Sequence, residues 1–302
     1  MNRLFWTGKL TLPMKILIES NNLLALFAGN VRNTDSMKNR IKKGYDGEYS
    51  QHVSLYDELA GGFQKRTAEY QIYGIDFHGK QVLDVGGGTG ILALMALEKG
   101  ATKVICGDIS GYMLEQGRKK AKNLGYSSDR IEFSQSDAEA LPFKDNSFDV
   151  VMTGNAFGLF PDQGKAVKEM FRVLRPGGFI SLGAHGPEHY WEAIDASLRV
   201  MDKLYFLGYR FEFWPRNENQ VRLLMEAAGF KNISMNRFIW RNLFKTPEDA
   251  SKFFSAVTSS WWFSKIPENK RIKEDAKTLQ YFIKKGIRVV TDDIIVGSGL
   301  KP

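Results

Sequence analysis

One stretch of the sequence, QVLDVGGGTGILA at residues 81–93, constrains the fold more than any other. Its apolar run at residues 82–85 is long enough for a buried parallel strand. The apolar run at residues 91–97 predicts a mostly buried helix that ends near Gly100. The glycines between the two runs let the backbone approach a ligand closely, and the beginning of the helix offers free N–H groups. The stretch therefore predicts a strand, a turn and a helix that together hold a ligand.

Two classes of ligand bind at a turn of this kind. Dinucleotide sites have the spacing G-x-G-x-x-G and place a pyrophosphate at the helix N-terminus. Here the spacing is G-x-G-x-G, formed by Gly86, Gly88 and Gly90. The acidic Asp84 precedes the first glycine by two residues, and a carboxylate there repels a pyrophosphate but attracts a cation. A glycine-rich turn without any ligand is the alternative explanation.

The next two strand-like segments each end in an acidic residue. A second apolar run ends at Asp108, which lies 18 residues beyond Gly90. A third run is followed directly by Asp137 and Ala138. In a doubly wound sheet these acidic residues would lie at the same edge as the glycine turn.

Two later segments complete a recognisable pattern. The letters LPF and SFDVV occur within residues 141–151, and LRPGG occupies residues 174–178. In this order, residues 80 to 182 resemble the class I S-adenosylmethionine (SAM) methyltransferases. They are most similar to the type 11 domain family, which includes the methyltransferases of ubiquinone and menaquinone biosynthesis.

The resemblance implies that the cofactor is SAM, whose ammonium and sulfonium groups suit an acidic residue beside the turn. It places Asp108 at the ribose, Asp137 and Ala138 beside the adenine, and tyrosines such as Tyr56 over the cofactor. The cofactor-binding residues that it implies are Tyr56, Asp84, Gly86, Gly88, Gly90, Asp108, Ile109, Asp137, Ala138 and Asn155.

Strand and helix patterns alternate along the chain, which predicts an α/β fold with a parallel, doubly wound sheet. We expect strands near residues 81–85, 103–107, 131–135, 148–153 and 179–184, and helices near 90–99, 111–124 and 163–173. Two late strands are expected at residues 231–240 and 292–299. The resemblance implies a Rossmann-like, seven-stranded sheet of order 3-2-1-4-5-7-6, with these two strands paired antiparallel at the edge.

The domain organisation follows from the segments outside this pattern. We predict an N-terminal helical lid at residues 1–75 and a methyltransferase domain at residues 76–302, with insertions near 187–215 and 246–288. Both insertions carry aromatic residues at helical spacing. Such residues usually form a core, but their number near the open end of the sheet also favours a lid around an apolar acceptor.

Methyl transfer from a sulfonium is an in-line displacement, so the protein chiefly supplies alignment and excludes water. An oxygen or nitrogen acceptor can also require a base. His185 is our first candidate for a catalytic base and His189 the second, because neutral imidazole accepts a proton near pH 7. Both can equally be structural. Since His185 closes strand five and Asn155 follows strand four, we expect both on the acceptor side.

The acceptor is expected to be a small, largely apolar or aromatic molecule. The segment Asn155-Ala156-Phe157 departs from the D/N-P-P-Y/F motif of enzymes that methylate amino groups of nucleic acids, which argues against a nucleic-acid acceptor. Three alternatives stay open: an RNA methyltransferase, a catalytically silent SAM-binding protein and a nicotinamide oxidoreductase. The sequence determines neither the methylated atom nor the oligomeric state.

Charge and composition add weaker constraints. The net charge of +8 sits mainly in residues 200–302, which hold 18 Lys and Arg against 11 Asp and Glu. That excess fits a solvated surface, an anionic substrate, an acidic lipid surface or a nucleic acid. Residues 10–28 are too interrupted for a membrane span but fit one or two amphipathic helices. We expect these helices to pack over the domain, with contact to a membrane surface as the alternative. The single Cys106 excludes a disulfide framework, and no pattern predicts a metal; we expect a cytoplasmic protein, with membrane association as an alternative.

Overall fold

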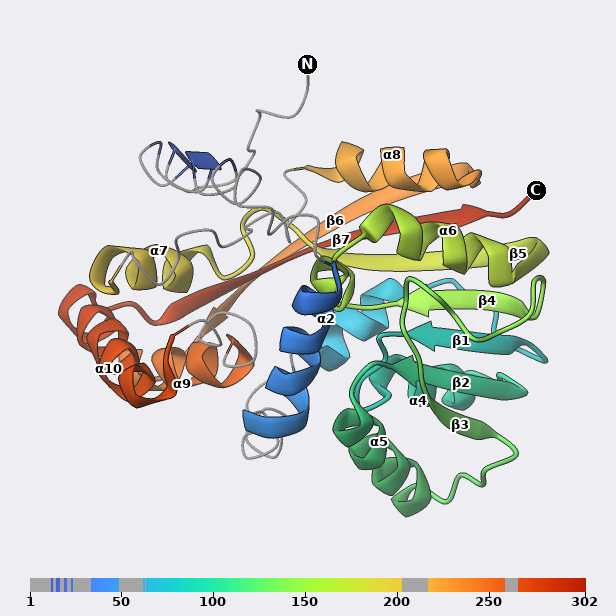
Figure 1. Cartoon of the computed structure of the whole chain (residues 1–302), viewed down its shortest axis with the longest axis horizontal. Helices are drawn as coiled ribbons and strands as arrows, with labels where there is room; N and C mark the ends of the chain where they lie inside the picture. Colours follow the sequence, from blue (N-terminus) through green and yellow to red (C-terminus); the bar gives the residue numbers. More distant parts are fainter. Residues whose placement is uncertain are drawn as a thin grey trace. The chain divides into compact units, whose positions relative to one another are not determined.

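The computed structural model of the chain is shown in Figure 1. It describes residues 34–48, 62, 64–202, 217–258 and 266–302, together with residues 12, 15, 16, 19, 20 and 23. The chain divides into two compact units. The sheet unit comprises Gly62–Ala184, Glu218–Arg237 and Ile295–Pro302, and the accessory unit comprises Met1–Gly61, His185–Asn217 and Phe238–Ile294.

A seven-stranded sheet has the order β3-β2-β1-β4-β5-β7-β6, which confirms the predicted order. Its first five strands run parallel. Figure 1 shows β3, β2, β1, β4 and β5 side by side. The strands are β1 (Gln81–Val85), β2 (Lys103–Asp108), β3 (Ile131–Gln135), β4 (Phe148–Thr153), β5 (Leu174–His185), β6 (Lys231–Leu243) and β7 (Val289–Leu300).

Backbone hydrogen bonds set the direction of β7. At the beginning of β5, Gly177 N donates to Lys301 O at 2.8 Å, and Lys301 N donates to Gly178 O at 3.0 Å. Just beyond the end of β5, Gly186 N donates to Asp293 O at 2.7 Å. The end of β7 therefore lies against the beginning of β5, so β7 runs antiparallel to β5.

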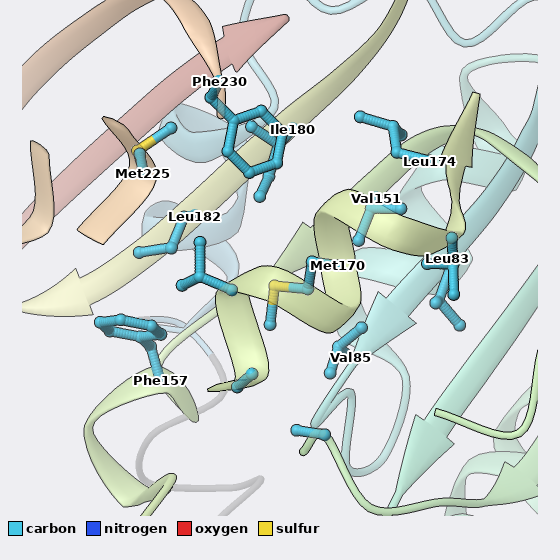
Figure 2. Close-up of a cluster of buried hydrophobic side chains, with 14 of the residues drawn as sticks. Leu83, Val85, Val151, Phe157, Met170, Leu174, Ile180, Leu182, Met225 and Phe230 are labelled. Carbon is cyan, nitrogen blue, oxygen red and sulfur yellow. The ribbon is translucent and has the colours of Figure 1, made fainter. Parts of the chain in front are cut away.

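Two hydrophobic cores cover the two faces of the sheet. One contains residues of the helical segment 64–71, of α4 (Ile91–Glu98) and of α5 (Gly111–Asn123). The other contains residues of α6 (Gln163–Val173) and α8 (Glu218–Ala228). Neighbouring strand residues enter opposite cores, as the pleat requires: Val82 enters the first and Leu83 the second. Figure 2 shows the second core, in which Leu83, Val85, Val151, Met170, Ile180, Leu182, Met225 and Phe230 gather.

The accessory unit is mainly helical. Its helices are α2 (Thr34–Lys43), the π-helix η1 (Gly44–Glu48), α7 (Trp191–Val200), α9 (Pro247–Thr258) and α10 (Glu268–Lys285), and α10 packs against α7 and α9. Thr246 Oγ1 caps α9 by accepting a hydrogen bond from Asp249 N at 3.1 Å. Phe253 and Phe254 are fully buried and therefore belong to the core of this unit. Among the described residues, no helix is both long and apolar enough to cross a membrane.

The beginning of β5 differs from our prediction. We expected a turn at residues 174–178 before a strand at 179–184, whereas the strand begins at Leu174. Phe148 pairs with Leu174 and Val150 pairs with Phe179, so residues 175–178 of β5 bulge opposite the single β4 residue Asp149, with Gly177 at φ +76°. The residues of the bulge belong to the strand because the backbone of Lys301, directly after β7, pairs with them. Lys301 lies more than a hundred residues later in the sequence.

Candidate cofactor site

The glycine turn between β1 and α4 adopts the conformation that its sequence predicts. Gly86, Gly88 and Gly90 have φ angles of +67°, +55° and +83°, a region that L side chains rarely adopt. A Cβ added at Gly87 would lie 2.6 Å from both the Asp84 carboxylate and the Cys106 sulfur. The turn therefore needs glycine for its backbone and for the space above Asp84.

Asp84 is a buried acid with one unused oxygen. Its side chain is 0% exposed, and Oδ2 accepts a hydrogen bond from Ala93 N, in the first turn of α4, at 3.1 Å. Oδ1 is buried without a hydrogen-bond partner among the described residues. Burial raises the pKa of Asp84 to about 7, and the nearby Asp108 adds to the rise. An unpaired buried carboxylate of this kind suits a cationic ligand.

Asp108, at the end of β2, is held by two backbone donors. Gly88 N donates to Oδ2 at 2.9 Å, and Ser110 N donates to Oδ1 at 2.8 Å. These bonds fix the plane of the carboxylate and join it to the glycine turn. A carboxylate can accept about four hydrogen bonds, so this group has the capacity to bind both hydroxyls of a ribose.

The segment after β3 lies at the same edge of the sheet. Ser136 N donates to Asp108 O at 2.9 Å, which joins the ends of β2 and β3. Asp137 Oδ1 accepts a hydrogen bond from Glu139 N at 2.9 Å, and Ala138 is buried in the second core. Ile109 follows Asp108, and its carbonyl accepts a hydrogen bond from Gln135 Nε2 at 2.9 Å. The structure thus gathers the predicted residues from three strands.

A tight turn follows β4 and contains Asn155. Ala156 N donates to Gly154 O at 2.5 Å across Asn155, whose φ is +51°. An i to i+2 bond with a positive central φ is a γ-turn, a rare and strained conformation. The Oδ1 atom of Asn155 is buried and has no partner among the described residues. A Cβ at Gly86 would lie 2.6 Å from that of Ala156, so this turn packs on the glycine turn.

The two candidate bases lie together in the accessory unit. The rings of His185 and His189 stack with centroids 4.0 Å apart and planes 10° apart. Asp293 N donates to His189 Nδ1 at 3.3 Å, which leaves the proton of a neutral ring on Nε2. Burial lowers the pKa of both imidazoles, to about 4 for His185. At neutral pH His185 can accept a hydrogen bond, but this pKa makes it a weak base.

The last two predictions concern Tyr56 and a bound metal ion. Tyr56, predicted to close over the cofactor, lies outside the described residues. In the described part of the chain, no group of three or more His, Cys, Asp or Glu side chains could hold a metal ion.

We did not predict one residue that joins several parts of the site. Gln71, at the end of the helical segment 64–71, is 3% exposed and donates hydrogen bonds to Thr153 at the end of β4 and to Ser181 within β5. The signal available in the sequence was the small residues Gly154, directly after one buried strand, and Ser181 and Gly183 within another.

Comparison with known proteins agrees with this geometry. A family model described as a methyltransferase domain matches residues 83–182. The ubiquinone/menaquinone biosynthesis C-methyltransferase UbiE of Cronobacter sakazakii (strain ATCC BAA-894) is 43% identical over 173 residues, which are 52% of this chain and 68% of that protein. UbiE of Hahella chejuensis (strain KCTC 2396) is 39% identical over 146 residues, 47% of this chain and 57% of that protein.

Solved structures share the fold at low sequence identity. The YcgJ protein of Bacillus subtilis has a TM-score of 0.55 and 21% identity, over 78% of this chain and 98% of that one. Phosphoethanolamine N-methyltransferase 2 of Haemonchus contortus, solved with S-adenosyl-L-methionine, has a TM-score of 0.57 and 18% identity, over 87% of this chain and 60% of that one.

Proposed function

The chain belongs to the class I SAM-dependent methyltransferases, and we propose that it methylates a carbon atom of a small aromatic molecule. SAM is its cofactor. The observation that carries the choice of acceptor is the 43% identity over 173 residues to an enzyme named for C-methylation in quinone biosynthesis. The match spans 68% of that relative and not its whole length. The acceptor is therefore our inference for this chain.

The residues present at the sheet edge fit SAM. Asp84 offers a buried, unpaired oxygen to its ammonium group, and Asp108 offers a fixed carboxylate to its ribose hydroxyls. Asp137 and Ala138 are proposed to lie beside its adenine. When bound, SAM supplies an already activated methyl group, so this chain needs to align the acceptor and keep water out.

We propose His185 as the residue that orients the acceptor. A ring carbon that accepts a methyl group is made nucleophilic by a hydroxyl on the same ring. A neutral imidazole can accept a hydrogen bond from that hydroxyl without carrying a charge. The low pKa of His185 favours this orienting role over full removal of a proton. His189, whose ring stacks on it, is the second candidate.

The acceptor is proposed to bind under a lid formed by residues 1–75, 187–215 and 246–288. Much of this lid, including Trp261–Phe263, lies outside the described residues. Phe253 and Phe254, which lie on α9, pack against Tyr190 and belong to the core that supports such a lid.

The test is a product assay with matched acceptors. Purified protein and SAM are incubated with a hydroquinone that has one free ring carbon, with the same compound already methylated there, and with unmethylated RNA. We expect S-adenosylhomocysteine release and a ring-methylated product, identified by mass spectrometry, from the first compound alone. Methyl transfer to RNA, to a hydroxyl oxygen or to none of the three would contradict the proposal.

A further inference from the structure

Gln71 joins a helix to two strands that are distant from it in sequence. Its Nε2 donates to Thr153 O, at the end of β4, at 2.8 Å and to Ser181 O, in β5, at 3.2 Å. Its own carbonyl accepts a hydrogen bond from Ser181 Oγ at 3.1 Å. The partners lie 82 and 110 positions along the chain, so a single side chain fixes the relative positions of three elements of the sheet unit.

The carboxamide of Gln71 fits only because its neighbours lack side chains. A Cβ at Gly183 would lie 2.5 Å from Gln71 Oε1, and a Cβ at Gly154 would lie 2.9 Å from the same atom. That oxygen is buried and has no hydrogen-bond partner among the described residues. A buried polar atom without a partner is costly, so a core built for stability alone would favour an apolar side chain here.

The strained turn that contains Asn155 begins directly after the strand residue that Gln71 binds. Such turns persist only where their surroundings hold them. On one side, Gln71 bonds to Thr153 O and packs on Gly154; on the other side, Ala156 packs against Gly86 of the glycine turn. The turn is thus clamped between the end of the helical segment 64–71 and the cofactor site.

We propose that Gln71 is a positioning residue for SAM binding. It holds the turn after β4 so that the buried Oδ1 of Asn155 faces a hydrogen-bond donor of the bound cofactor. The proposal rests on the proposed function in that SAM is the cofactor, and it adds that Asn155 contacts SAM, as the family resemblance implies. It needs neither the identity of the acceptor nor a role for His185.

The first experiment separates positioning from simple anchoring. Gln71→Met keeps the length and packing of the side chain but removes both hydrogen bonds that Nε2 donates, to Thr153 O and to Ser181 O. The matched control, Ser181→Ala, removes the other bond between Gln71 and β5 and leaves the carboxamide in place. We measure the affinity for S-adenosylhomocysteine by calorimetry and the thermal unfolding midpoint. Gln71→Met should weaken binding about tenfold, the size expected when one hydrogen bond between Asn155 and the cofactor is lost, whereas Ser181→Ala should lower only the unfolding midpoint.

A double-mutant cycle provides a second route that does not depend on the methionine variant. Gly183→Ala places a methyl group 2.5 Å from Gln71 Oε1, which must then move, and should weaken S-adenosylhomocysteine binding as Gln71→Met does. In a Gln71→Ala background the carboxamide is absent, so the same alanine should weaken binding no further.

Four results would overturn the inference. Gln71→Met with wild-type affinity but a lower unfolding midpoint would leave Gln71 a structural residue. Equal losses of affinity in Gln71→Met and Ser181→Ala would show general anchoring, and additive effects in the cycle would exclude a shared cause. A wild-type protein that does not bind S-adenosylhomocysteine would overturn both proposals, whereas one that binds it but methylates no small molecule would overturn only the proposed acceptor.

Discussion

Replacing Asp84 by asparagine tests whether the buried carboxylate that would bind a cation lowers the stability of the ligand-free protein. The carboxylate is fully buried, and its pKa is about 7 against 3.8 for an ordinary aspartate. The folded protein therefore binds this proton more tightly than the unfolded chain does. The contribution of Asp84 to stability is complete below pH 3.8 and is lost as the pH rises to 7.

The size of the effect follows from the shift in pKa. One pH unit corresponds to about 1.4 kcal/mol, so a shift of roughly three units removes about 4 kcal/mol from the free energy of unfolding between pH 4 and pH 7. In Asp84→Asn this pH-dependent loss disappears. The new amide group lies where Oδ1 has no partner, which costs about 1–3 kcal/mol at every pH. We therefore expect the ligand-free variant to be less stable than wild type at pH 4 and more stable at pH 8.

As the pH rises, the affinity of the wild-type protein for SAM should increase while its free energy of unfolding decreases. The ammonium group of SAM favours the ionised carboxylate, so wild-type affinity should rise as the pH increases to 7 and then level off. Asp84→Asn should bind SAM weakly and with little dependence on pH. The assays are urea unfolding at pH 4, 5, 6, 7 and 8 and calorimetry at pH 5, 6, 7 and 8. The control is Asp76→Asn, at an exposed position of the same unit. Stability curves of Asp84→Asn and wild type that run parallel across this range would refute the argument.

Three further substitutions test separate parts of the structure. Asp108→Ala should weaken SAM binding by about 1–3 kcal/mol in calorimetry; a folded variant with unchanged affinity would remove Asp108 from the ribose site. His185→Gln, which keeps a hydrogen-bonding group, should retain more turnover than His185→Ala, with SAM affinity unchanged in both; equal turnover would count against an orienting role. Lys301→Met removes hydrogen bonds from Nζ to Asn146 Oδ1 and to the carbonyls of Phe171 and Leu174. It should lower the free energy of unfolding by about 2 kcal/mol in urea titrations, and a loss below a few tenths would show that solvent replaces these bonds.

The cofactor turn and the order of the strands could be predicted because their signals are local or recur in order along the chain. Gly86, Gly88 and Gly90 all adopt positive φ angles, which their spacing already indicated. The helix stop near Gly100 was likewise confirmed, with a φ angle of +94°. In these places the conformation needed by the backbone dictates the residue type.

Other features depend on contacts that no local pattern records. Gln71 reaches partners 82 and 110 positions away, and the early beginning of β5 depends on pairing with Lys301. The stacking of His185 on His189 could not be predicted from their spacing, because the ring of His189 is held by the backbone of Asp293, 104 positions later. Sequence patterns identified the residue types at the site, and the long-range packing determined which of them meet.

The position of β7 has a consequence for how the protein is made. This strand follows every other strand in the chain, yet it lies between β5 and β6 in the sheet. During synthesis, β1 to β5 can pair as soon as they leave the ribosome, whereas β6 has no neighbour in the sheet until residues 289–300 emerge. Until then the nascent chain exposes one open edge on β5 and both edges of β6, and unpaired edges promote aggregation. A message truncated before Val289 would therefore yield a chain whose parallel strands are complete but which requires a chaperone to stay in solution.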